Sequence, residues 1–179
     1  MKANLSEKRY KHSLGVQDMA VKLAKIYGVD VDKADFAGRY HDIAKCFDEE
    51  TMNSYVRKYG LPDKYLGNPA LAHSKVAAEI LKHEFGVVDE DVLNSVRYHT
   101  TGRRDMSLLE EIVFAADAIE DNRDYPSLKE LQKRAETDLH SVSLEILDFI
   151  MDTLSEKGRL IDPDTIEARE WIKEITGEH

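Results

Sequence analysis

The segment SLLEEIVFAADAI, residues 107–119, begins with a helix-start signal and continues as the longest nearly apolar run of the chain. Ser107 and Glu110 have the spacing of a capping box, so we expect a helix to begin here. Asp117 is the one carboxylate within Val113–Ile119. Among apolar neighbours it costs several kcal/mol unless it is paired or bound to a cation. The segment therefore predicts a core helix that carries a functional group.

Helix signals recur on both sides of this segment, and strand signals do not. A second capping-box pattern, Ser127 with Glu130, predicts another helix start. We predict a single all-α domain over residues 1–179, in which the helices after about residue 127 form a C-terminal extension packed on the rest. The other expected helices span 6–28, 32–46, 48–60, 68–86, 89–99 and 139–158, with a last one beginning at Asp162-Pro163.

Composition limits the class of protein. The formal net charge is −10 over 179 residues, whereas a general nucleic-acid binder has a basic balance, so we expect no nucleic-acid partner. The apolar run is far shorter than the roughly 20 residues that span a bilayer, and no signal peptide is recognisable, so we expect no membrane segment. Cys46 is the single cysteine and cannot build a disulfide framework. These features predict a cytoplasmic protein.

Four histidines fall on four different predicted helices, and Asp117 falls on another. Neighbours on a helix lie about 100° apart, so His41 and Asp42 can both reach one point beside the helix axis. Imidazole and carboxylate ligands together suit divalent metals such as iron, manganese, zinc or nickel. We therefore expect a metal site built from His12, His41, Asp42, His73, His99 and Asp117.

Two arrangements of these ligands are open. Six ligands suffice for two metals with an aspartate between them, and such a pair stabilises both oxygens of an in-line displacement at phosphorus. In a one-metal arrangement His73 and His99 contact phosphate, and the other four residues bind the ion. For the three histidines outside this set, His83, His140 and His179, we expect a solvated or capping role.

The ordered ligand series resembles the HD superfamily of metal-dependent phosphohydrolases, which are all-helical domains. The series is Arg9-Tyr10-Lys11-His12-Ser13, His41-Asp42-Ile43-Ala44-Lys45, His73, His99 and Asp117. More specifically, four further stretches resemble the YqeK family, and the likeness covers nearly the whole chain. These stretches are Arg97-Tyr98-His99-Thr100-Thr101-Gly102-Arg103, Ser107-Leu108-Leu109-Glu110, Ile119-Glu120-Asp121-Asn122-Arg123-Asp124 and Asp162-Pro163-Asp164-Thr165-Ile166-Glu167-Ala168-Arg169.

The resemblance implies a single HD-domain helical bundle with a defined reaction. The implied activity is symmetrical hydrolysis of diadenosine tetraphosphate to two ADP, with one or two iron ions as cofactor. Manganese or another divalent transition metal stays open. Carried over to this chain, the family pattern places metal on His12, His41, Asp42 and Asp117, and His73 and His99 complete the site.

An acidic protein repels a polyphosphate unless local cations focus the field. Arg9 and Lys45 each lie three residues from a proposed ligand, and arginines follow His99 and Asp117 in predicted loops. The start of the last helix offers free backbone N–H groups for ribose or base recognition. The expected substrate-binding residues are Arg9, Lys45, His73, His99, Thr100, Thr101, Arg103, Arg123, Pro163, Asp164 and Thr165.

The expected mechanism is attack of a metal-bound hydroxide on a central phosphorus, with Asp42 and Lys45 as the catalytic residues. Lys45 and Arg123 would stabilise the charge that develops on the phosphate oxygens. Two alternatives are open beside this small-molecule nucleotide hydrolase. One is an HD-type hydrolase of a deoxynucleotide, a nucleoside monophosphate or a guanosine polyphosphate. The other is a nucleotide or metal sensor without turnover, and a homodimer is compatible with each.

Overall fold

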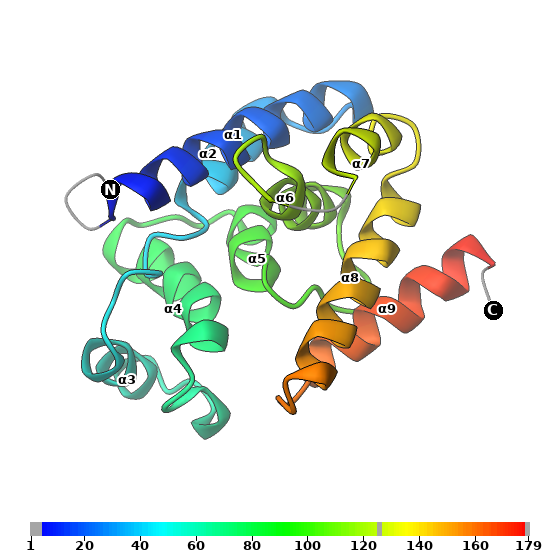
Figure 1. Cartoon of the computed structure of the whole chain (residues 1–179). Helices are drawn as coiled ribbons and strands as arrows, with labels where there is room; N and C mark the ends of the chain where they lie inside the picture. The colour runs from blue at the N-terminus through cyan, green and yellow to red at the C-terminus, as the bar shows by residue number, and fades with distance from the viewer. Residues whose placement is uncertain (1–4, 125–126, 178–179) are drawn as a thin grey trace.

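The computed structural model describes residues 5–124 and 127–177, and this part of the chain is helical without a β-strand (Figure 1). The prediction of an all-α fold is confirmed. No described helix is long and apolar enough to cross a membrane. The helices are α1 (Glu7–Tyr27), α2 (Val31–Tyr40), α3 (Glu49–Lys58), the 3-10 helix η1 (Asp63–Tyr65), α4 (Pro69–Glu84), α5 (Glu90–Tyr98), α6 (Leu108–Ile119), α7 (Leu128–Arg134), α8 (Leu139–Glu156) and α9 (Pro163–Thr176).

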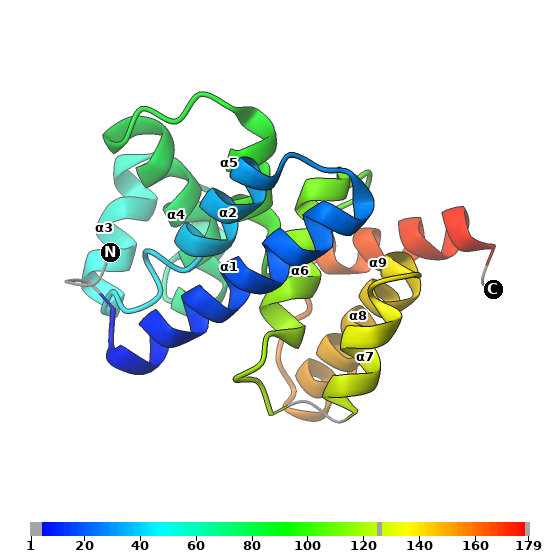
Figure 2. The same ribbon diagram turned by 90° about the horizontal axis from the view of Figure 1, so that it is seen from above.

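Helix α6 is the centre of the molecule. Its capping box is present as predicted, with the Ser107 side chain accepting from the Glu110 backbone and the Glu110 side chain accepting from the Ser107 backbone. The helix packs against α1, α2, α5, α7 and α8, and its apolar residues are almost completely buried. Figures 1 and 2 show α6 between the N-terminal helices and the group α7, α8 and α9. Burial of most α6 side chains among these helices therefore joins the N-terminal helices to the C-terminal ones.

The C-terminal helices reach the core through α8. Helix α8 packs on α6, α9 packs on α8, and α3 packs on α4 at the other side of the molecule. In Figure 1, α8 and α9 stand opposite α3 and α4, with the start of α9 below the middle of the fold. The fold thus brings residues 68–71 together with Arg159, Leu160, Asp162 and Thr165 to the lining of one cavity.

Two local features differ from the sequence-based expectation. Helix α2 begins after Asp30, whose side chain accepts from two backbone N–H groups, and it ends at Tyr40 instead of continuing to Cys46. Residues 41–46 form turns, and His41 and Asp42 at the start of these turns are both buried. The predicted capping box at Ser127 is wrong, because Ser127 has φ of 58° and its side chain caps no backbone group. Tyr125, Pro126 and His179 lie outside the described residues.

Candidate active site

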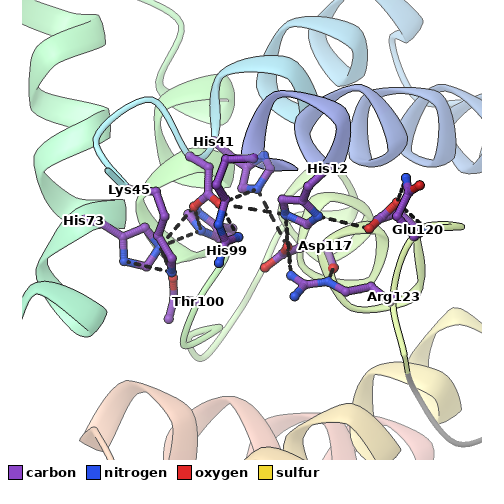
Figure 3. A network of polar contacts seen from close by, with 12 residues as sticks. His12, His41, Lys45, His73, His99, Thr100, Asp117, Glu120 and Arg123 are labelled. Atoms are coloured by element: carbon purple, nitrogen blue, oxygen red, sulfur yellow. Dashed lines mark hydrogen bonds and ion pairs between the residues drawn. The ribbon is translucent and has the colours of Figure 1, made fainter. Parts of the chain in front are cut away.

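Figure 3 shows His12, His41, His73 and His99 gathered in one cluster, and all four are buried. The contacts of the buried Asp42 carboxylate place it among these histidines. Its Oδ1 is 3.3 Å from His73 Nε2 and 3.6 Å from His99 Nε2. Its Oδ2 is 3.6 Å from His41 Nε2 and 3.8 Å from His12 Nε2. These four imidazoles come from α1, α4 and the C-terminal ends of α2 and α5. The structure therefore turns four distant histidines toward one carboxylate.

Asp117 extends the cluster from the central helix α6. Its Oδ1 lies 2.9 Å from His12 Nε2 and 3.7 Å from His41 Nε2. Arg123 donates both to the Asp117 carboxylate and, at 2.7 Å, to the Asp117 main-chain oxygen. The carboxylate inside the apolar run is thus paired, as its desolvation requires.

Two histidines are held in one tautomer by the helix ends on which they lie. His41 Nδ1 is 2.8 Å from the Gly38 oxygen, and His99 Nδ1 is 2.8 Å from the Val96 oxygen. A carbonyl oxygen only accepts, so each Nδ1 carries the hydrogen and each Nε2 keeps its lone pair. Among the described residues His41 Nε2 is buried without a hydrogen-bond partner. A buried lone pair of this kind is the signature of a ligand position.

A buried carboxylate that the sequence analysis did not single out orients His12. Glu120 Oε1 lies 3.1 Å from His12 Nδ1, and Glu120 Oε2 accepts from the backbone and side chain of Asn122 at 2.8 and 2.7 Å. Gly15 makes room for this carboxylate, since a Cβ there would be 2.1 Å from Glu120 Oε2. Carboxylates in this position fix the orientation of metal-binding imidazoles. Gly15, inside a helix and three residues after His12, was the sequence feature that could have indicated a close approach of another group.

Electrostatics favour neutral imidazoles beside ionised carboxylates. Burial lowers the pKa of His41 and of His73 to about 4 each. Burial by itself would raise the pKa of Asp42, but the histidines around it hold that pKa well below its usual range. At Asp117 burial is likewise outweighed by His12 and Arg123, which keep its pKa low. At neutral pH His41 and His73 therefore present lone pairs beside the negative charge of the carboxylates, which suits a divalent cation.

The six predicted ligands fall into three overlapping groups, in each of which the ligand atoms lie within 4.8 Å of one another. Asp42 belongs to two of these groups, which lie on either side of it. With the unpartnered His41 nitrogen, this arrangement fits a divalent metal. The groups are His12 with His41 and Asp42, His41 with His99 and Asp117, and Asp42 with His73 and His99.

Three of the predicted cations lie at this cluster, and one does not. Arg9 Nη1 is 2.9 Å from Asp42 Oδ2, Lys45 Nζ is 3.0 Å from His73 Nε2, and Arg123 Nη2 is 3.5 Å from His12 Nε2. Burial lowers the pKa of the Lys45 ammonium. Arg103 instead holds the buried Glu110 with bonds of 2.6 and 2.7 Å. The structure therefore gives Arg103 a role in holding α6.

A cavity of about 650 Å³ opens beside the cluster. At its inner end lie Lys45, His99, Thr100, Thr101 and Asp117, with Thr100 Oγ1 3.2 Å from His73 Nε2. One wall is apolar, and the outer end is formed by the segment that leads into α9. The apolar wall consists of Leu71, Phe114, Ile146, Ile150 and Leu154, and the outer end of Arg159, Leu160, Asp162 and Thr165.

Not every predicted residue of the last helix reaches this cavity. Thr165 lines it, whereas Pro163 and Asp164 are not among its lining residues. Asp164 Oδ2 accepts from the buried Lys75 at 3.0 Å. Among the histidines outside the cluster, His83 lies 3.3 Å from Glu79, and His140 lies 2.9 Å from the buried Glu111. His140 thus secures a buried carboxylate.

Comparisons with known proteins find relatives along nearly the whole chain. A family model described as the HD domain matches residues 9–122. The "Bis(5'-nucleosyl)-tetraphosphatase, symmetrical" of Bacillus subtilis (strain 168) is 39% identical over 173 residues, which cover 96% of this chain and 93% of that protein. The protein of the same name from Halalkalibacterium halodurans is 41% identical, over 93% of this chain and 89% of its own length.

A solved structure extends the likeness to the whole fold. The crystal structure of a predicted HD superfamily hydrolase involved in NAD metabolism from Clostridium acetobutylicum matches with a TM-score of 0.91 and 42% sequence identity. The match covers 97% of this chain and 93% of that chain. It therefore includes the C-terminal helices beyond the region of the family model.

Proposed function

Because the chain belongs to the HD-domain family, and relatives along nearly its whole length are symmetrical bis(5'-nucleosyl)-tetraphosphatases, we propose that it hydrolyses diadenosine tetraphosphate symmetrically. One water is added across the central phosphoanhydride bond, and two ADP are released. The observation that carries this assignment is the six-residue ligand cluster at the inner end of a cavity whose wall is apolar.

The HD domain and the cluster indicate a divalent metal, and we propose iron in that role. Imidazole and carboxylate donors without a thiolate suit iron and also manganese. His12, His41 and Asp117 would hold one ion, His73 and His99 a second, and Asp42 both, since Asp42 belongs to groups on either side. When bound, such a cation supplies Lewis acidity to a phosphoryl group and lowers the pKa of a water molecule.

The protein's own cations neutralise the polyphosphate beside these ligands. Lys45 lines the inner end of the cavity, and its half-buried ammonium is positioned to donate to a phosphate oxygen. Arg9 and Arg123 are partly exposed at the other side of the cluster and present guanidinium groups there. Preorganised donors of this kind stabilise the charge that develops on phosphate oxygens during transfer.

The cavity suits the nucleoside end of the substrate. Its apolar wall offers Ile146 and Ile150 to a flat aromatic base, and Thr165 offers a hydroxyl group to polar atoms, whereas the Thr101 hydroxyl donates to the Gly102 oxygen. Pockets that combine an apolar wall with a few placed polar groups are typical of small-molecule sites. The base therefore lies toward α8 and α9, with the phosphates directed at the ligand cluster.

A product assay tests this function. The protein is freed of metal, reconstituted anaerobically with Fe²⁺ or with Mn²⁺, and incubated with diadenosine tetraphosphate. We expect ADP as the sole nucleotide product and no turnover by the metal-free protein. ATP with AMP would show asymmetrical cleavage. Orthophosphate released from mononucleotides in preference to diadenosine tetraphosphate would indicate a different nucleotide hydrolase. No hydrolysis with metal bound would indicate a sensor.

A further inference from the structure

Lys75 is a buried cation outside the ligand cluster. It lies on α4, two residues after His73, and is only 3% exposed. An ammonium taken out of water is unfavourable unless it is paired, so its partners identify its role. The proposed reaction and the metal cluster do not account for it.

The partners of Lys75 come from two other segments of the chain. Its Nζ donates to Asp164 Oδ2 at 3.0 Å and lies 3.8 Å from the centre of the Tyr98 ring. Tyr98 is the last residue of α5 and precedes His99, whereas Asp164 lies in the first turn of α9. The side chain thus joins α4, α5 and α9 at one point.

The same three segments each contribute to the lining of the cavity. Asp162 and Thr165, on either side of Asp164, line its outer end, and His99 lines its inner end. Helix α9 packs on α8, and the Lys75–Asp164 pair links its first turn to α4. Lys64, on η1, forms a second ion pair with the start of α9, 2.9 Å from Asp162, but its side chain is substantially exposed. The Lys75 ammonium is more shielded from water than that of Lys64, so dissolved salt weakens the attraction in the Lys75 pair less.

Taking the proposed function as the premise, we propose that Lys75 is a positioning residue, which holds the first turn of α9 against α4 and α5 and so sets the outer wall of the nucleoside cavity. It contacts no reacting atom. Its loss lets the segment 162–165 move away from the base, so substrate and product bind more weakly. The ligand cluster stays in place, because His73 and His99 keep their own partners. Asp164 acts in the same way, from the α9 side of the pair.

The test compares Lys75→Met, Lys75→Arg and Asp164→Asn with Lys82→Met. Lys82 is the matched control, since it lies on the same helix and forms a 3.0 Å pair with Glu90 at the surface. A methionine fills the space of the buried lysine. Removing one partner of a buried pair is costly where the other charge stays buried, but the Asp164 side chain is 29% exposed, so water can solvate its carboxylate in this variant. The measurements are KM and kcat for diadenosine tetraphosphate, the affinity for ADP with Mn²⁺ present, the affinity for Mn²⁺ alone, and amide hydrogen exchange over residues 163–169.

We expect Lys75→Met to raise KM and to weaken ADP binding on the order of ten-fold, with kcat and Mn²⁺ affinity within about two-fold of wild type. Exchange in the first turn of α9 should accelerate. Asp164→Asn should share these effects, Lys75→Arg should recover most of the ADP affinity, and Lys82→Met should resemble wild type.

Unchanged ADP affinity and unchanged exchange in Lys75→Met would overturn the inference, as would a fall in kcat with KM unchanged. If Lys75→Met did not fold, Asp164→Asn would decide by the same readouts. A wild-type protein without hydrolysis of diadenosine tetraphosphate would refute the proposed function, whereas ADP affinity and exchange would still test Lys75.

Discussion

Gly15 lies directly against the carboxylate of Glu120, so that a Cβ at position 15 would be 2.1 Å from Glu120 Oε2. Glu120 in turn is bonded to His12 Nδ1. Because Gly15 on α1 has no side chain, the Glu120 carboxylate can lie against this helix and orient His12 of the cluster.

We expect Gly15→Ala to weaken metal binding by about 10- to 100-fold, the usual effect of losing a group that orients a metal-binding histidine. Alanine inside a helix normally stabilises it by about 0.5–1 kcal/mol, so a loss would come from displacement of Glu120. Titration with Mn²⁺ measures the affinity. Gly28→Ala is the control, because Gly28 has φ of 71° and no atom near its Cβ position, so it loses stability away from the site. Equal metal affinity in Gly15→Ala and wild type would contradict the role of Glu120.

Asp42 is shared by two of the ligand groups, so its replacement should affect the whole cluster. We expect Asp42→Ala to lower turnover of diadenosine tetraphosphate by more than about 100-fold, a larger loss than for an orienting group. The assay is run in metal-defined buffer, with bound metal counted by elemental analysis. Glu111→Gln, which alters a buried carboxylate that pairs with His140 and belongs to none of the ligand groups, is the control. Wild-type turnover in Asp42→Ala would refute the proposed site.

The pKa values of His41 and His73 predict how the metal-free protein responds to acid. Both fall from 6.5 to about 4 in the folded state, so the unfolded chain binds more protons between these values. Their contribution to stability is complete above pH 6.5 and is lost as the pH falls toward 4. Urea unfolding of the metal-free protein from pH 8 to 4.5 measures this slope. It should become shallower in His41→Gln and stay unchanged in the exposed His83→Gln, and equal slopes in all three proteins would contradict the burial argument.

His140 predicts a pH dependence of the opposite sign at higher pH. Its hydrogen bond to Glu111 raises the pKa of the imidazole above 6.5. The stabilisation by this pair is therefore complete below pH 6.5 and is lost as the pH rises through the folded-state value. Because His140 is partly exposed, we expect less than about 1 kcal/mol. The difference in unfolding free energy between wild type and His140→Gln should shrink from pH 6 to pH 8.5, and a constant difference would show that His140 acts without its charge.

The apolar wall of the cavity is tested by one substitution on α8. We expect Ile150→Gln to raise KM for diadenosine tetraphosphate about ten-fold, since a base loses roughly 1.5 kcal/mol of apolar contact there. Metal affinity should not change, because Ile150 belongs to none of the ligand groups. Met151→Gln is the neighbouring control outside the cavity lining. The same KM in both variants would place the base elsewhere.

Local sequence was sufficient to predict most of the helices and the residue types of the proposed ligand cluster. Caps such as Ser107 and the 3.6-residue period act within a few residues, so the helical class and most helix starts follow from them. The same holds for the residue types of the cluster, because a carboxylate in an apolar run and histidines on separate helices already indicate a cation. The prediction of a capping box at Ser127 was wrong, because the left-handed backbone there leaves the Ser127 side chain without a capping hydrogen bond.

Distances between segments depended on packing. Burial of α6 among five helices is what places Asp117 beside His12 and His41, residues far apart along the chain. Packing also paired Arg103 with Glu110 and Lys75 with Asp164, and neither pair can be predicted from local sequence. It placed Glu120 against Gly15 as well, where the helical glycine marks a close approach but does not identify the partner. The partner of a long charged side chain depends on which groups lie near it and on how far they are removed from water. Packing of the helices determines both.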